Sequence, residues 1–221
     1  MSSDAISAAG CQAAGILAAL GWVALALQLV VSIDLTTSAG RTVVAALWSY
    51  LGYFTILTNL LVAVTLTRVW RGRKSGSTTP SISTISGVML AIAIVGVVYH
   101  TLLSMRVPAM GPLWWTADRM LHYLIPILSV LWWLKYVPTH TLTYRDAVTW
   151  LAFPVGYLAY ALVRGSFDGW YPYFFIDVGA LGYRRTLMNA TVLSVAMLSA
   201  GGIVVAGTRF MATGRARRRR D

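Results

Sequence analysis

Long runs of apolar residues, separated by short polar segments, dominate this sequence. A helix needs roughly 20 mostly apolar residues to cross the roughly 30 Å of hydrocarbon in a bilayer, and six runs approach or meet that length. The pattern therefore predicts an all-α integral membrane protein, a bundle of six transmembrane helices. The predicted spans are Gln12–Ile33, Val43–Val69, Ile85–Met105, Leu113–Tyr136, Ala147–Val163 and Thr186–Thr208.

Composition supports a membrane protein and excludes several other classes. The chain is 57% hydrophobic and only 11% charged, whereas soluble domains average about 25% charged residues. A net charge of +11 invites a nucleic-acid interpretation, but most basic residues lie at the ends of apolar runs, where they set topology. Cys11 is the single cysteine, and no metal-ligand spacing is present. We therefore expect a single membrane domain over residues 1–221, without nucleic acid, metal or cofactor.

The distribution of basic residues predicts the orientation of the chain. With the N-terminus inside, the 18 Lys and Arg residues divide into twelve on the inner side and six on the outer side. The positive-inside rule then places both termini in the cytoplasm, as expected for a multi-pass protein of the plasma (inner) membrane. The basic tail, residues 209–221, is expected to contact anionic lipids of the inner leaflet.

Polar side chains inside two predicted spans are the candidates for chemistry. Thr55 and Thr58 lie in the second span, and His122 lies in the fourth. A threonine hydroxyl becomes a good nucleophile when an adjacent base removes its proton, and histidine suits that role near neutral pH. The pattern predicts acyl transfer with a threonine nucleophile and a histidine base. Because the two threonines are three positions apart, near one helix face, either one can be the nucleophile.

Four further residues are candidates for supporting roles. Asn59 can donate its amide to an oxyanion or orient the base. Asp118 precedes His122 by four positions and can hold the imidazole, while His100 is a structural partner. Arg119 either snorkels or pairs with Asp118; alternatively, it receives the carboxylate of an acidic lipid. The competing structural interpretation is that such polar groups only bond neighbouring helices.

Counting residues along the spans predicts that the two halves of the site lie at similar depth. Thr55 is twelve residues after Val43, and His122 is nine residues after Leu113, so both lie roughly 13 to 18 Å from the outer ends. If the fourth span begins at Arg119 instead, His122 is only about 5 Å deep.

An aromatic segment, Gly169–Asp177, separates the last two predicted spans. It is too aromatic for an ordinary loop, and Pro172 breaks any helix through it. We expect it to fold back as a cap over an outward-facing cavity. The candidate cap residues are Trp170, Tyr171, Tyr173 and Asp177.

Three stretches, Tyr53–Leu60, Leu121–Pro126 and Trp170–Phe174, resemble bacterial members of the androgen-induced-protein-like membrane family. In animals that family includes multi-pass hydrolases of fatty acid esters of hydroxy fatty acids, with a membrane-embedded threonine nucleophile and a histidine. The resemblance implies that Thr55 is the nucleophile, that His122 is the base, and that the substrate is a lipid-like ester. Thr58 stands where the animal pattern has an aspartate.

Two other functions compete with hydrolysis. The same polar residues can line the passage of a non-enzymatic binder or transporter of small amphiphiles, or the chain can be a structural subunit of a larger complex. Transporters often contain internal repeats, and no convincing repeat relates the first three predicted spans to the last three. This counts against transport.

Overall fold

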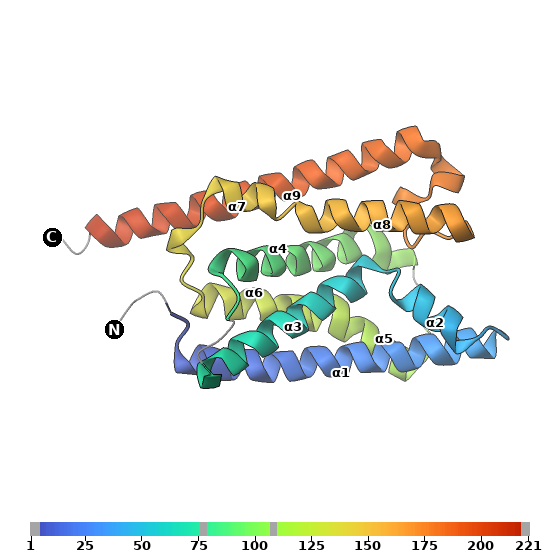
Figure 1. The fold of residues 1–221 in the computed structure, drawn as a ribbon, viewed down its shortest axis with the longest axis horizontal. Coiled ribbons are helices and arrows are strands. Elements are labelled where there is room, and N and C mark those ends of the chain that lie inside the picture. The colour runs from blue at the N-terminus through green and yellow to red at the C-terminus, as the bar shows by residue number, and fades with distance from the viewer. Residues whose placement is uncertain (1–4, 76–78, 107–109, 218–221) are drawn as a thin grey trace. The chain divides into compact units, whose positions relative to one another are not determined.

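The computed structural model describes residues 5–75, 79–106 and 110–217 (Figure 1). All regular secondary structure in these residues is helical, which confirms the all-α prediction. The chain forms two compact units, Met1–Pro138 and Thr139–Asp221, and each is described by itself. The prediction of one membrane domain over the whole chain stays a prediction.

Several helices in the described part of the chain are able to cross a membrane. Four qualify by length and composition, and a fifth is added if a bent helix pair counts as one span. The four are Ala8–Ser38, Ile82–Arg106, Tyr144–Asp168 and Val178–Phe210. The predicted fourth span is a helical stretch, Pro112–Tyr136, but it is less apolar because it carries Asp118, Arg119 and His122. These findings confirm the coarse prediction of a multi-pass membrane protein.

In the first unit, α1 (Ala8–Ser38) lies antiparallel to α3 (Phe54–Ser75) (Figure 1). Small residues of α1 permit a close approach, because a side chain on Gly15 would overlap the ring of Trp70. Trp22 Nε1 also donates a hydrogen bond of 3.2 Å to the hydroxyl of Thr67. Close packing over small residues, supported by a few polar bonds, is how helices associate in a membrane.

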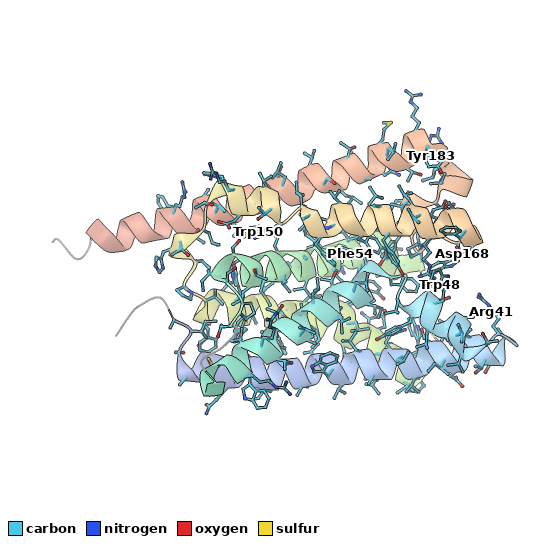
Figure 2. All side chains as sticks on the ribbon, viewed as in Figure 1. Arg41, Trp48, Phe54, Trp150, Asp168 and Tyr183 are labelled. Atoms are coloured by element: carbon cyan, nitrogen blue, oxygen red, sulfur yellow. The ribbon has the colours of Figure 1, made fainter. Side chains whose placement is uncertain are left out.

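The predicted continuous span Val43–Val69 is instead two helices. α2 (Val43–Tyr50) and α3 meet at 77° across a short break, and Phe54, labelled in Figure 2, is the first residue of α3. Gly52 lies in the break, and glycine costs a helix interior about 1 kcal/mol relative to alanine. The hydroxyl of Tyr50 bonds the carbonyl of Leu25 on α1 at 2.8 Å, which anchors the end of α2. Thr55 is therefore the second residue of a helix and not the middle of one.

Two helical stretches of the first unit each contain a π-helical turn. A proline lacks the amide N–H, and its ring clashes with the carbonyl of the residue four positions earlier. For Pro126 that residue is His122, and the wider π-helical turn that contains His122 relieves this clash. The side chain of Trp133 bonds the hydroxyl of Ser86 at 2.9 Å and ties the two stretches together. The first stretch consists of α4 (Ile82–Val98), the π-helical turn η1 (Tyr99–Leu103) and η2 (Ser104–Arg106). The second consists of α5 (Pro112–Arg119), the π-helical turn η3 (Met120–Leu124) and α6 (Ile125–Tyr136).

The second unit is built from two long helical stretches joined by the aromatic segment. Thr143 and Asp146 form a capping box at the start of the first stretch, and Gly201 packs closely against Ala147. The helices extend beyond the predicted spans Ala147–Val163 and Thr186–Thr208, so only residues 169–177 separate them. The elements are η4 (Thr139–Thr141), α7 (Tyr144–Thr149), α8 (Ala152–Asp168), η5 (Phe174–Ile176) and α9 (Val178–Arg217), which bends at Gly182.

The predicted basic tail, residues 209–221, is partly contained in α9. That helix continues to Arg217, and the guanidinium of Arg209 lies 5.1 Å from the ring centre of Tyr144. Residues 218–221 lie outside the described residues. The contact of this tail with the inner leaflet stays a prediction.

Candidate functional site

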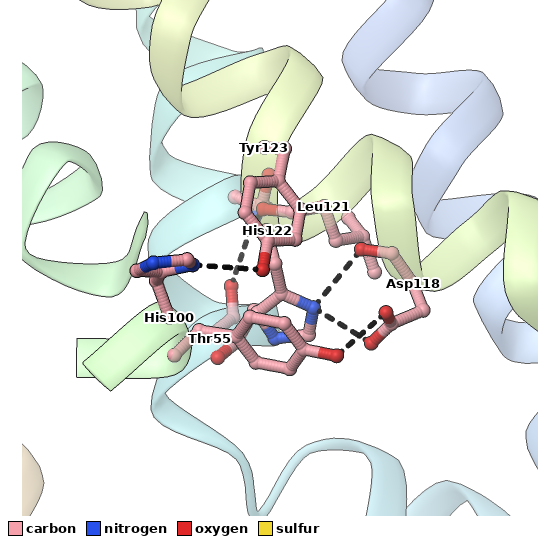
Figure 3. A network of polar contacts seen from close by, with 8 residues as sticks. Thr55, His100, Asp118, Leu121, His122 and Tyr123 are labelled. Carbon is pink, nitrogen blue, oxygen red and sulfur yellow. Dashed lines mark hydrogen bonds and ion pairs between the residues drawn. The ribbon is translucent and has the colours of Figure 1, made fainter. Parts of the chain in front are cut away.

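Asp118 and His122 form a close pair where α5 passes into η3 (Figure 3). Nδ1 of His122 lies 3.0 Å from Oδ1 of Asp118 and 3.0 Å from its backbone carbonyl oxygen. The carboxylate is buried, and the imidazole is only 15% exposed. A carboxylate beside Nδ1 favours the tautomer with the proton on that nitrogen, which leaves Nε2 as a proton acceptor. The contact predicted from their spacing is present.

Tyr99 contacts both members of this pair. Its hydroxyl donates a hydrogen bond of 2.6 Å to Oδ2 of Asp118, and its ring stacks on the imidazole of His122 at 3.7 Å with an angle of 17°. Tyr99 is not among the candidate residues identified from the sequence. The one sequence feature that could have done so is its position directly before His100 inside an apolar run.

Asn59 ties the first turn of α3 to the turn that carries the histidine. Its Nδ2 donates to the carbonyl oxygens of Thr55, at 2.9 Å, and of Leu121, at 3.3 Å. Both amide protons are thereby used, so the predicted donation to an oxyanion would require breaking one of these bonds. Asn59 is instead an interhelical tie, fully buried, that brings the threonine-bearing and histidine-bearing turns together.

The two candidate threonines differ in what their surroundings allow. The hydroxyl of Thr58 donates a bond of 2.7 Å to the carbonyl of Phe54 one turn earlier, and its side chain is fully buried. Thr55 is also buried, at 8% exposure, and lies at the N-terminal end of α3. The two threonines therefore differ in their position along the helix, and the choice of Thr55 as the nucleophile stays a prediction.

The break before α3 bears on the predicted depth of Thr55. The predicted depth of roughly 13 to 18 Å assumed that one helix axis continued from Val43 to Thr55, whereas α2 and α3 meet at 77°. The depth of Thr55 stays a prediction.

Arg119 and His100 both contact aromatic side chains close to the pair. The guanidinium of Arg119 lies over the rings of Trp115 and Tyr123, at 5.5 and 5.1 Å from their centres. No ion pair joins it to Asp118, whose carboxylate contacts His122 and Tyr99 instead. Nδ1 of His100 is 3.3 Å from the hydroxyl of Tyr123. Both residues line the neighbourhood of the pair without contacting its carboxylate.

The predicted cap is an ordered turn within the second unit. The ring of Trp170 lies 4.9 Å from the guanidinium of Arg164, and the ring of Tyr171 occupies the space that a side chain at residue 165 would fill. Tyr173 stacks on Phe175 with ring centres 5.2 Å apart. Burial raises the pKa of the Tyr171 hydroxyl above its ordinary value.

Asp177 closes the cap segment with a structural role. Its Oδ1 accepts a hydrogen bond of 3.1 Å from the backbone N–H of Ala180. This bond satisfies one of the unpaired amides in the first turn of α9. Asp177 is therefore the N-terminal cap of α9.

An open apolar depression of about 220 Å³ lies between α8 and α9. Hydroxyls of Thr191 and Ser194 are its polar groups, and no titratable side chain lines it. The depression therefore offers no acid or base for acyl transfer. Its apolar lining residues are Leu151, Leu158, Leu187, Ala190, Val195 and Leu198.

Taken together, the site in the first unit contains an oriented imidazole and a threonine at a helix N-terminus on the adjoining turn. An imidazole with an unprotonated Nε2 can remove a proton from a hydroxyl or from water. Among the described residues, no group of three or more His, Cys, Asp or Glu side chains is placed to hold a metal ion. No family model, curated protein or solved structure with which the chain was compared matches it.

Proposed function

We propose that this protein is a membrane-embedded hydrolase of lipid-like esters, with Thr55 as the nucleophile and His122 as the base. One observation carries the proposal: the buried Asp118–His122 pair is held against the Thr55-bearing turn by the side chain of Asn59. A nucleophile, a base and an acid that orients the base are the parts that acyl transfer requires.

In the proposed reaction, Nε2 of His122 accepts the hydroxyl proton while Oγ of Thr55 attacks the ester carbonyl carbon. The tetrahedral intermediate collapses, the bond to the leaving alkoxide breaks, and the alkoxide takes the proton from His122. Water then attacks the Thr55 acyl ester and transfers a proton to Nε2. Collapse of the second intermediate releases the carboxylic acid and returns the proton to Thr55. Asp118 stabilises the imidazolium formed in each half-reaction.

The break before α3 contributes to this chemistry. A helix N-terminus carries a partial positive charge, which favours negative charge close to its first turn. Thr55 is the second residue of a helix of 22 residues, so charge that develops on Oγ and on the carbonyl oxygen forms where this field is strongest. Fixed dipoles directed at developing charge are commonly the largest contribution to acyl-transfer catalysis.

The proposal includes a topology and a substrate class. We place both termini in the cytoplasm and count six spans, with α2 and α3 together as the second and Pro112–Tyr136 as the fourth, in the plasma membrane. The substrate is a lipid-like ester of the type formed by fatty acids with hydroxy fatty acids, as the resemblance to the androgen-induced-protein-like family implies. No cofactor takes part in the proposed reaction.

Hydrolysis of ester substrates by the purified protein tests the proposal. We expect Thr55→Ala and His122→Ala to lose turnover, because each lacks one member of the nucleophile–base pair, while Thr55→Ser retains part of it. Thr58→Ala is the matched control, since it removes a neighbouring hydroxyl that already bonds its own helix. Folded Thr55→Ala protein with wild-type turnover, or loss only in Thr58→Ala, contradicts the assignment.

A further inference from the structure

Tyr99 is the first residue of the π-helical turn η1, on a different helical stretch from Asp118 and His122. Only 4% of its surface is exposed. It nevertheless contacts both residues of the pair, through its hydroxyl and through its ring face. One side chain therefore constrains two partners that lie one turn apart on another helix.

The hydrogen bond from Tyr99 divides the two carboxylate oxygens of Asp118 between two donors. Oδ1 contacts Nδ1 of His122 at 3.0 Å, and Oδ2 accepts the phenol proton at 2.6 Å. A bond of this length between a hydroxyl and a carboxylate is in the range of charge-assisted hydrogen bonds. With both oxygens engaged, the carboxylate cannot rotate about its terminal torsion without losing one of the bonds.

The ring of Tyr99 constrains the imidazole in a second way. The stacked geometry, with 3.7 Å between ring centres, fixes the plane of the imidazole and hence the direction of its Nε2 lone pair. Tyr123 meets the ring of Tyr99 edge-on, with centres 5.6 Å apart at 89°. The phenol ring is thus held by a ring face of His122 and a ring edge of Tyr123, and its own orientation is fixed.

We infer that Tyr99 is a positioning residue for the histidine base: its hydroxyl holds the carboxylate of Asp118, and its ring sets the plane of His122. This inference rests on the proposed function, since it assigns a role in aiming Nε2 at the nucleophile. Tyr99 itself transfers no proton to or from the substrate. The two contacts are separable, because Tyr99→Phe removes the hydroxyl alone and Tyr99→Leu removes the hydroxyl and the aromatic face.

Steady-state kinetics separate positioning from a merely structural role. We expect Tyr99→Phe to lower kcat by about 10-fold to 100-fold, with little change in KM. This loss is smaller than the loss caused by replacing the orienting aspartate of a catalytic triad, because Asp118 itself remains. Tyr99→Leu lowers kcat further. Trp132→Phe is the control, because it removes another buried side-chain donor of the same unit, one that bonds the carbonyl of Gly10 away from the site, and its kcat stays at the wild-type value.

A double variant tests whether Tyr99 acts through Asp118. If it does, Tyr99→Phe combined with Asp118→Asn is no slower than Asp118→Asn alone, because residues that act as a unit have non-additive effects. Wild-type kcat in Tyr99→Phe, or full additivity in the double variant, overturns the inference.

A nitrogen NMR measurement distinguishes failure of this inference from failure of the proposed hydrolase. In protein labelled with ¹⁵N-histidine, we expect the wild-type His122 signals to show protonated Nδ1 and unprotonated Nε2, and Tyr99→Phe to show a mixture of tautomers. Substitution of His100 and His140 by Gln assigns the signals. A shifted spectrum without any ester hydrolysis supports the positioning role and refutes the hydrolase; an unchanged spectrum in Tyr99→Phe refutes the positioning role, whatever the activity.

Discussion

Asp118→Asn replaces one carboxylate oxygen by an amide nitrogen and leaves the side-chain shape unchanged. Asp118 accepts hydrogen bonds from two donors, Tyr99 at 2.6 Å and His122 at 3.0 Å. An asparagine has one acceptor oxygen and one donor nitrogen. If the phenol continues to donate, as it does to Asp118, the amide oxygen must accept its proton, so the new amide N–H group faces Nδ1 of His122. The imidazole must then accept there and carry its proton on Nε2, which removes the lone pair that the reaction uses.

The expected loss is large because the wrong tautomer abolishes the base. In a serine-protease triad, the corresponding substitution lowers kcat by about 10⁴-fold. Here the backbone carbonyl of Asp118 also lies 3.0 Å from Nδ1 and offers an alternative acceptor that preserves part of the active tautomer. We therefore expect kcat to fall by about 10³-fold, which corresponds to about 4 kcal/mol of transition-state stabilisation.

Turnover of a short-chain chromogenic ester by detergent-solubilised protein measures this effect. Asp34→Asn is the matched control, since Asp34 is an exposed residue of α1 outside the site, and its kcat is expected to equal that of the wild type. KM for Asp118→Asn stays near the wild-type value, because the carboxylate does not touch the substrate. A folded Asp118→Asn protein with kcat within about threefold of wild type refutes the assignment of the carboxylate as the orienting acid.

Three further substitutions test the supports of the site. Asn59→Leu removes both bonds that tie the turns of Thr55 and His122; we expect a stability change below about 2 kcal/mol in chemical unfolding but a fall in kcat of about tenfold or more, and an unchanged kcat refutes the tie. Pro126→Ala supplies an N–H for the carbonyl of His122, so the π-helical turn tightens and the imidazole rotates; we expect a higher melting temperature together with a fall in kcat of about 10²-fold. In Gly96→Ala, the new Cβ lies 3.2 Å from Cβ of Pro126 and 3.3 Å from the carbonyl oxygen of His122, so thermal unfolding is expected to show a loss of about 1 to 3 kcal/mol.

The helical class and the pairing of Asp118 with His122 could be predicted because both follow from local rules. Apolar runs of span length indicate membrane helices, and residues four positions apart share a helix face. The break at residues 51–53 could not be predicted in this way. Its sequence is apolar, and a single glycine is common in unbroken membrane helices, so the sequence gives no sign of the bend or of the bond between Tyr50 and Leu25 beside it.

Tyr99 and the role of Asn59 depend on partners that are distant in the sequence. Tyr99 lies near the end of a span, where a tyrosine is ordinarily a membrane-interface anchor, and its partner Asp118 is nineteen positions away. The amide of Asn59 reaches Leu121, on another helix. Local spacing carries no information about such contacts, so the sequence could suggest that Asn59 donates to an oxyanion or orients the base, but not that its amide bonds the carbonyls of Thr55 and Leu121.

The identity of the acylated residue is the most direct test of the proposed mechanism. Purified protein is incubated with a lipophilic fluorophosphonate, digested, and analysed by tandem mass spectrometry, with His122→Ala protein treated in parallel. The proposed mechanism predicts a covalent adduct on Oγ of Thr55 that is absent or strongly reduced in His122→Ala. An adduct on Thr58 or elsewhere, or ester hydrolysis by a protein whose Thr55 is never modified, contradicts it.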